Sequence, residues 1–258
     1  MSSQPASTQS VREQFGAVAD AYARSSYHSS GPDLAALVEA AHLAGDERVL
    51  DIGSGAGHTA LAVARHAAQV TGLDVTPEMV GVATALAAQR GVTNVTFQLG
   101  DVVALPFGDA SFDVVTSRVS AHHYADPVPA LAEAFRVLRP GGQFFLIDTV
   151  APEDAALDTF FNCFELLRDS SHVRNWRGSE WLRMLAAAGF EASMLQRFAV
   201  ALDGQDWVQR MRTPAEKVAT LRQLFAEATP AQRDAFELRD EAPWGLSVPI
   251  ALIRAVKP

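Results

Sequence analysis

Three glycines follow an acidic residue at alternate positions in the segment Asp-Ile-Gly-Ser-Gly-Ala-Gly, residues 51–57. The residues before this segment are apolar, as in a buried strand, and those after it favour a helix. Glycine has no side chain and tolerates positive φ angles, so a ligand can lie directly against its backbone. The N–H groups at the start of the following helix can receive an anionic group. We therefore expect Gly53, Ser54, Gly55 and Gly57 to border a bound cofactor.

Two kinds of adenosine cofactor fit a glycine loop of this type. In the dinucleotide pattern G-x-G-x-x-G, the third glycine would fall at position 58, where this chain has His58. The carboxylate of Asp51 would also lie beside the pyrophosphate of a dinucleotide and repel it. S-adenosylmethionine (SAM) instead carries an ammonium and a sulfonium group, which an acidic residue attracts. The residues favour SAM over NAD, while an NAD-dependent oxidoreductase and a turn that binds nothing stay open as alternatives.

The same motif resembles the first motif of the class I SAM-dependent methyltransferases, an acidic residue followed by G-x-G-x-G at the end of the first strand. The resemblance covers about residues 11–150 and is closest to the branch of the ubiquinone and menaquinone biosynthesis methyltransferases and related uncharacterised bacterial methyltransferases. It implies an α/β fold with a doubly wound, mostly parallel seven-stranded sheet. It also implies SAM as the cofactor and in-line methyl transfer to a small-molecule acceptor. A non-catalytic SAM-binding protein is a further alternative, because a fold does not establish chemistry.

Further cofactor contacts are expected where later strands end. Asp74 follows the glycine loop by about 20 residues, the spacing at which an acidic side chain accepts hydrogen bonds from ribose hydroxyls. Asp74 could instead cap the next helix, but Thr76 already precedes Pro77 at that capping position. The resemblance places Asp101 beside the adenine amino group. The other cofactor positions that it implies are Tyr22, His28, Val75, Met79, Gly100, Val102 and Arg118.

Two adjacent histidines, His122 and His123, lie in a loop that the resemblance places at the mouth of the transfer site. Histidine can remove a proton near pH 7, so both are candidate general bases. His123 ranks first because it lies deeper in the loop, and packing without a chemical role is the alternative for either ring. No metal site is predicted, because these histidines and Asp126 follow no recognisable ligand motif.

The elements that must position these residues alternate between strands and helices. This alternation predicts a parallel sheet covered on both faces, with right-handed crossovers. The expected strands are residues 48–52, 69–73, 95–99, 112–117, 143–148, 192–202 and 246–256, and the helices between the first five of these strands are residues 58–67, 78–90 and 128–138.

The chain reads as one domain with additions at its start and in its second half. Residues 1–10 are small and polar, and we expect a disordered tail there. Residues 11–258 form a single methyltransferase domain, with helical cap segments at about residues 153–190 and 204–244. An insertion of the latter length between two strands is usually functional, and an apolar cap with several arginines suits a small, partly apolar acceptor.

Composition narrows the classes of partner. The chain has 258 residues, of which 48% are hydrophobic, and a formal net charge of -9 from 21 basic and 30 acidic residues. The average field repels phosphate backbones, so we expect no nucleic acid partner. A single cysteine, no apolar run long enough to span a bilayer and no secretory signal favour a cytoplasmic protein. The oligomeric state stays open.

Overall fold

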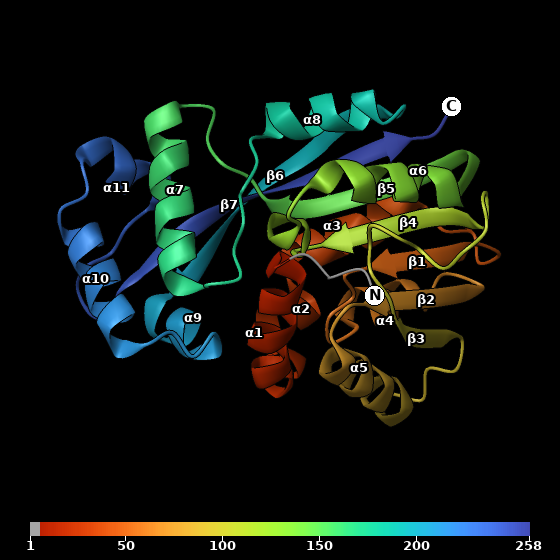
Figure 1. Ribbon diagram of the computed structural model, residues 1–258, viewed down its shortest axis with the longest axis horizontal. Coiled ribbons are helices and arrows are strands. Elements are labelled where there is room, and N and C mark those ends of the chain that lie inside the picture. Colours follow the sequence, from red (N-terminus) through yellow and green to blue (C-terminus); the bar gives the residue numbers. More distant parts are fainter. Residues whose placement is uncertain (1–5) are drawn as a thin grey trace.

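A seven-stranded sheet runs through the centre of the molecule (Figure 1) in the computed structural model, which describes residues 6–258. The strand order is β3-β2-β1-β4-β5-β7-β6, with parallel pairing from β3 to β5 and antiparallel pairing of β7 to both β5 and β6. The expected doubly wound, mostly parallel seven-stranded sheet is confirmed. Its strands are β1 Arg48–Ile52, β2 Gln69–Asp74, β3 Val95–Leu99, β4 Phe112–Arg118, β5 Leu138–Thr149, β6 Glu191–Asp203 and β7 Gly245–Val256.

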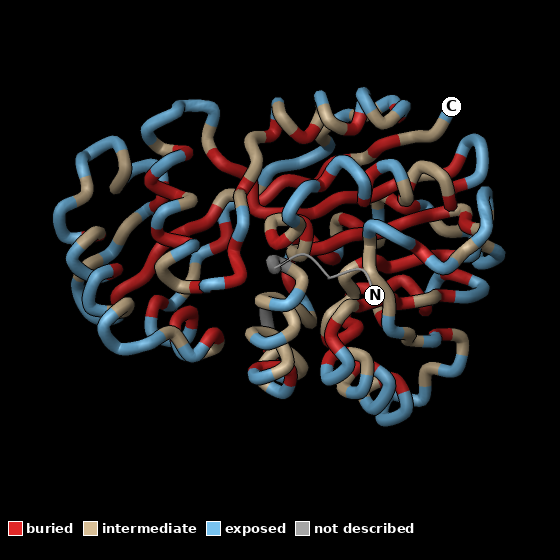
Figure 2. Tube along the Cα trace, in the orientation of Figure 1, coloured by how far each residue is buried: buried red, intermediate tan, exposed pale blue. Residues whose placement is uncertain are grey.

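Helices cover both faces of this sheet, because its central strands are apolar on both sides. Val49 packs with helices on one face, whereas the next residue, Leu50, packs with α6 and α8 on the other. The central strands are buried, whereas the edge strands β3 and β6 and the outer helix surfaces are more exposed (Figure 2). The helices are α1 Ala6–Ala23, α2 Ser26–Ser30, α3 Pro32–Ala41, α4 His58–Val63, α5 Pro77–Gln89, α6 Pro127–Val137, α7 Ala155–Arg168, α8 Gly178–Ala187, α9 Gly204–Arg210, α10 Ala215–Ala226 and α11 Pro230–Phe236, with a short 3-10 helix at Ala121–His123.

Four helices gather at one end of the sheet, around the extended ends of β6 and β7 (left of Figure 1). α7, α10 and α11 share a cluster of aromatic rings with centroids 5.1–6.4 Å apart, formed by Phe160, Phe161, Phe164, Phe225 and Phe236. Together with α9 they form the cap, so most of the expected cap is helical as predicted. α8 differs from that expectation, because its buried Trp181 and Leu185 pack on the sheet among residues of β5 and β7.

The N-terminal helix also differs from the sequence-based expectation. Residues 1–5 of the expected disordered tail lie outside the described residues, but residues 6–10 form the first turns of α1. α1 packs along α5, with Ala19 buried against Met79, and its Thr8 and Val11 line a cavity. The small polar composition of residues 6–10 therefore did not indicate a helix. Packing against other parts of the protein stabilises helices more than their own composition does.

A buried ion pair joins the N-terminal region to the sheet. Arg118, at the end of β4, donates from Nε to Asp33 Oδ2 at 2.6 Å and from Nη2 to Oδ1 at 3.2 Å. Its Nη1 donates to the backbone carbonyl of His28 at 2.9 Å. Asp33 lies in the first turn of α3 and is fully buried. One guanidinium therefore holds α2, α3 and β4 together.

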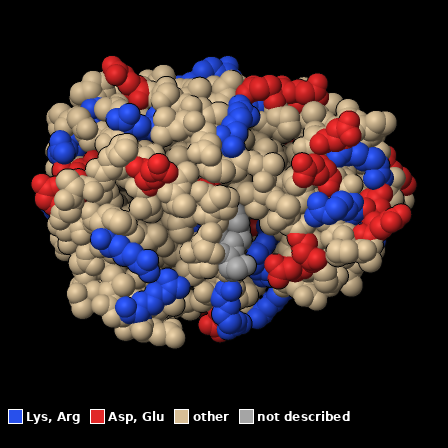
Figure 3. Space-filling model, turned by 180° about the vertical axis from the view of Figure 1, so that it is seen from behind, with Lys and Arg blue, Asp and Glu red and all other residues tan. Residues whose placement is uncertain are grey.

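Acidic and basic side chains are interspersed over the face that Figure 3 shows. Across residues 6–258, the helices are too short or too polar for any of them to traverse a lipid bilayer.

We predict that Asp33→Ala lowers the free energy of unfolding by about 3–5 kcal/mol, because it leaves the buried guanidinium of Arg118 without its carboxylate. Denaturant titration followed by circular dichroism measures the loss. In the double variant with Arg118→Met the uncompensated charge is gone, and we expect a smaller loss than in Asp33→Ala alone. A single-variant loss below about 1 kcal/mol would show that solvent screens this pair.

Candidate functional site

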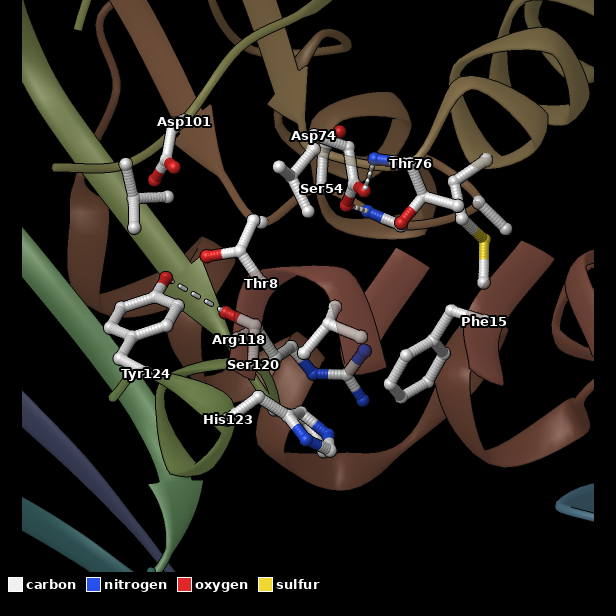
Figure 4. Close-up of a pocket in the computed structure, with 18 of the residues that line it drawn as sticks. Thr8, Phe15, Ser54, Asp74, Thr76, Asp101, Arg118, Ser120, His123 and Tyr124 are labelled. Atoms are coloured by element: carbon white, nitrogen blue, oxygen red, sulfur yellow. Dashed lines mark hydrogen bonds between the residues drawn. The ribbon is translucent and has the colours of Figure 1, made fainter. Parts of the chain in front are cut away.

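A cavity of about 420 Å³ lies at the carboxyl ends of β1, β2 and β4. The strand order turns back between β1 and β4, so their following segments leave the sheet in different directions and open a crevice. Figure 4 shows Ser54, Asp74 and Thr76 on one side of this cavity and Ser120, His123 and Tyr124 on another.

The glycine loop brings the backbone of one wall close to the opposite wall. Gly53 has a φ of +64°, and a Cβ at this position would lie 2.6 Å from Oγ of Ser120. Gly55 has a φ of +52°, but a Cβ there would meet nothing within 4 Å. Only glycine suits the close approach at Gly53, whereas Gly55 turns its backbone toward open space in the cavity.

Asp74 is nearly buried on the same wall. Its Oδ2 accepts from the backbone N–H of Gly55 at 2.8 Å, and its Oδ1 accepts from that of Thr76 at 2.9 Å. Burial raises the pKa of Asp74, although these N–H donors oppose the shift. Thr76 occupies the N-cap position of α5 before Pro77, as expected, but its side chain makes no capping hydrogen bond. Asp126, in contrast, caps α6 through Val128 as its position before Pro127 suggests.

Asp51 lies behind the glycine loop and does not line the cavity. Its side chain is buried, and Oδ1 accepts a hydrogen bond of 2.7 Å from Oγ1 of Thr116. Burial raises the pKa of Asp51 to about 7. The structure therefore places this acid beneath the loop, where it contacts the neighbouring strand β4.

Most of the residues that the sequence assigns to a cofactor come together at this cavity. Those that line it are Tyr22, His28, Gly53, Ser54, Gly55, Asp74, Val75, Met79, Asp101, Val102 and Arg118. Asp51, Gly57 and Gly100 do not line it. Sequence reasoning missed Thr8 and Phe15 as wall residues. A signal exists for Phe15, since it stands seven residues before Tyr22 and so falls on the same helix face.

A smaller cavity adjoins the first one on the side of the cap. Its polar residues include Glu165 and Arg168 from α7 and Arg210 from α9. Arg168 stacks over the ring of Trp207, with its Cζ 5.1 Å from the ring centroid. The residues that line both cavities are Phe15, Tyr22, His28, Val119 and His123.

The two candidate histidines have different surroundings. Nδ1 of His122 lies 2.6 Å from Oδ1 of Asp148, whereas Nδ1 of His123 lies 3.0 Å from the carbonyl of Ser171. Burial and the neighbouring His122 lower the pKa of His123 to about 4. Burial also acts to lower the pKa of His122, but the carboxylate of Asp148 outweighs it and the net shift is upward.

The described part of the chain contains no group of three or more His, Cys, Asp or Glu side chains arranged to hold a metal ion.

Comparisons with known proteins agree with this geometry. The methyltransferase domain family matches residues 50–146. The uncharacterised methyltransferase YcgJ of Bacillus subtilis is 40% identical over 222 residues, which cover 86% of this chain and 88% of YcgJ. The crystal structure of YcgJ superposes with a TM-score of 0.84 at 38% identity, over 87% of this chain and 97% of that one.

A second relative has a named activity. The demethylmenaquinone methyltransferase of Deinococcus radiodurans is 35% identical over 164 residues, which cover 60% of this chain and 67% of that protein. The glycine loop, the sheet topology and these relatives agree on one family and on methyl transfer from SAM, and they give no support to an NAD-dependent oxidoreductase. The chain belongs to the class I SAM-dependent methyltransferases.

Proposed function

We propose that the larger cavity binds SAM and that a small-molecule methyl acceptor binds beside it, where the smaller cavity of about 60 Å³ adjoins. The observation that carries this proposal is their common wall. Phe15 and His123 meet edge to face there, with ring centroids 4.9 Å apart, and both rings line both cavities. A donor and an acceptor that both contact these shared residues would have their reacting atoms close together.

The larger cavity offers a partner for each part of SAM. The open backbone at Gly55 and the start of α4 suit the carboxylate, and Asp74 suits the ribose hydroxyls because each of its oxygens can accept a second hydrogen bond. Asp101 suits the adenine amino group. Ser54 also lines this wall.

The protein contributes position rather than a reactive group of its own to the transfer. When bound, SAM supplies a methyl group that its sulfonium already activates. Phe15, Val11 and Met79 line the cavity with apolar surface. Holding two reactants in line is worth about 7–11 kcal/mol of the activation barrier.

One experiment tests the proposed class of acceptor. A cell extract is split by ultrafiltration into small molecules and macromolecules, and each fraction is incubated with the protein and SAM. We expect S-adenosylhomocysteine to form with the small-molecule fraction. Its formation with the macromolecular fraction alone would contradict the proposal.

We predict that Asp74→Ala weakens SAM binding by about 10- to 150-fold. The variant loses a charge-assisted hydrogen-bond acceptor for buried hydroxyls, and this loss costs roughly 1.5–3 kcal/mol of binding free energy. Asp154→Ala is the matched control, because Asp154 also accepts from two backbone N–H groups but lies at the start of α7. Calorimetry should show normal SAM affinity for this control. Equal affinities in both variants would remove Asp74 from the ribose site.

We predict that Gly55→Val abolishes SAM binding, because its side chain would fill the space where the backbone faces the cavity. Gly91→Val is the matched control, since Gly91 also has a positive φ, of +65°, with nothing within 4 Å of its added Cβ. Both variants should lose about 1–2 kcal/mol of stability to backbone strain. If Gly55→Val still binds SAM within about twofold of the wild type, the loop does not contact the cofactor.

We predict that Asp51→Asn changes how the stability of the SAM-free protein depends on pH. The carboxyl of an unfolded aspartate ionises near pH 4, about 3.9, whereas that of Asp51 has a folded pKa of about 7. Between about pH 4 and pH 7 the folded state therefore keeps a proton on Asp51 that the unfolded state has lost. The free energy of unfolding falls as the pH rises through this range. Urea titrations at pH 5 and pH 8 should show a smaller fall in the variant, and an unchanged pH dependence would contradict the buried, raised pKa.

A further inference from the structure

The cap supplies two arginines to the smaller cavity. Arg168 comes from the last turn of α7 and Arg210 from the last turn of α9. Arg168 donates from Nε to the carbonyl of Trp207 at 3.2 Å, and Arg210 follows Trp207 by about one helical turn. The side chains of Arg168 and Arg210 keep only 9% and 11% of their surface exposed. Two nearly buried guanidinium groups therefore border one small cavity.

Both arginines act on the wall that the smaller cavity shares with the larger one. Burial raises the pKa of Tyr22, and the charges of Arg168 and Arg210 oppose this rise. Burial lowers the pKa of His28 well below its usual value, and the charges of Arg210 and Arg168 are among those that lower it further. Tyr22 and His28 line both cavities. The positive charge of the cap therefore extends to the boundary with the larger cavity.

One acidic side chain, Glu165, lines the smaller cavity together with these arginines. Its Oε2 lies 3.7 Å from Nη1 of Arg168, which is longer than a hydrogen bond. Burial raises the pKa of Glu165 and so favours its uncharged form, although Arg168 opposes the shift. This pair therefore leaves the terminal N–H groups of Arg168 able to donate to another acceptor.

Other carboxylates near the arginines do not line the cavity. Asp206 lies 3.5 Å from Arg210, but its side chain is 73% exposed, so water screens its charge. Asp169 accepts hydrogen bonds from the backbone N–H and the hydroxyl of Ser171. Within the lining itself, two basic groups face one acidic group. The cavity therefore favours an anionic group over a cationic one.

The size of the cavity limits which anionic group can enter. Its volume is about 60 Å³. A water molecule needs about 10–15 Å³ of such space, so roughly four to six non-hydrogen atoms fit. A carboxylate with one or two attached carbons has this size, whereas a fused ring system is too large. A carboxylate is also planar and ionised at pH 7, and its two oxygens match the fork of a guanidinium group.

We propose that the methyl acceptor carries a carboxylate and that Arg168 and Arg210 bind this carboxylate in the smaller cavity. This inference rests on the proposed function. The carboxylate anchors the acceptor, and the atom that is methylated lies at its other end, toward the wall shared with the larger cavity. The carboxylate itself is a poor nucleophile there, because the guanidinium N–H groups bind its lone pairs.

The first test measures recognition of a carboxylate alone. Propionate is titrated by calorimetry into protein saturated with S-adenosylhomocysteine, at pH 7.5 in a buffer free of carboxylates and phosphate. Propionamide, propylamine and inorganic phosphate are titrated in the same way. We expect saturable binding of propionate and at least tenfold weaker binding of the other three probes. Absence of saturable propionate binding, or tighter binding of any other probe, overturns the inference.

Variants show whether the two arginines are responsible. Arg168→Met and Arg210→Met should each weaken propionate binding by about tenfold or more, because each removes charge-assisted hydrogen bonds. Arg183→Met is the matched control, since Arg183 is exposed on α8, and it should bind propionate as the wild type does. Unchanged affinity in both cavity variants overturns the inference.

A change in the opposite direction separates recognition from damage to the fold. Glu165→Gln removes the acidic group from the lining and should tighten propionate binding. Arg168 also stacks on Trp207, so circular dichroism checks the fold of each variant. If Arg168→Met does not fold, Arg210→Met and Glu165→Gln decide the question. Weaker propionate binding in a folded Glu165→Gln protein contradicts the proposed role of the arginines.

The second test uses the acceptor in the small-molecule fraction of the cell extract. One portion is treated with a carbodiimide and excess methylamine, which convert carboxylates to amides, and another portion is treated with phosphatase. After removal of the reagents, each portion is incubated with the protein and SAM. We expect amide formation to lower the yield of S-adenosylhomocysteine at least tenfold and phosphatase to leave it unchanged.

The outcomes separate the two proposals. Full activity after amide formation, or loss of activity after phosphatase treatment, overturns the inference and leaves the proposed function standing. If the untreated small-molecule fraction yields no S-adenosylhomocysteine, or the wild-type protein fails to bind SAM, the proposed function itself is contradicted.

Discussion

The arrangement of the site depends on the direct pairing of β1 with β4. These strands are neighbours in the sheet, yet the chain leaves them toward helices on opposite faces, so nothing fills the space beyond their ends. The gap is narrow at its base, where the backbone at Gly53 approaches the hydroxyl of Ser120. It widens from there into the larger cavity. The rest of the molecule acts on this opening, since α1 closes one side and the cap supplies the adjoining cavity.

The sheet could be predicted because its signals are local. Alternating apolar segments and helix starts at Pro77 and Pro127 gave strand and helix positions that differ from the structure mainly at their ends. The glycine motif likewise predicted one wall of the larger cavity, because a strand–loop–helix unit carries its own geometry. Asp51 shows the limit of this reasoning, since the motif names the residue but its side chain turns toward Thr116 beneath the loop.

What could not be predicted depends on contacts between distant segments. The polar composition of residues 6–10 suggests disorder, but in the structure they form the first turns of α1, which packs against α5. The sequence of α8 predicts a helix with one apolar face, but this pattern does not show whether that face packs in the cap or on the sheet. For the two histidines, position in the loop favoured His123, but the partners that distinguish them, Asp148 and Ser171, are 26 and 48 residues away in the chain.

The position of Phe15 has a consequence for the entry and release of ligands. This ring belongs to α1 and borders both cavities, and the helix is tied to the cap by hydrogen bonds from Gln14 and Tyr22 to Met211. A displacement of α1 large enough to release one ligand therefore opens the compartment of the other. In the proposed function both ligands therefore contact the same helix, and the position of α1 affects the entry and release of each of them.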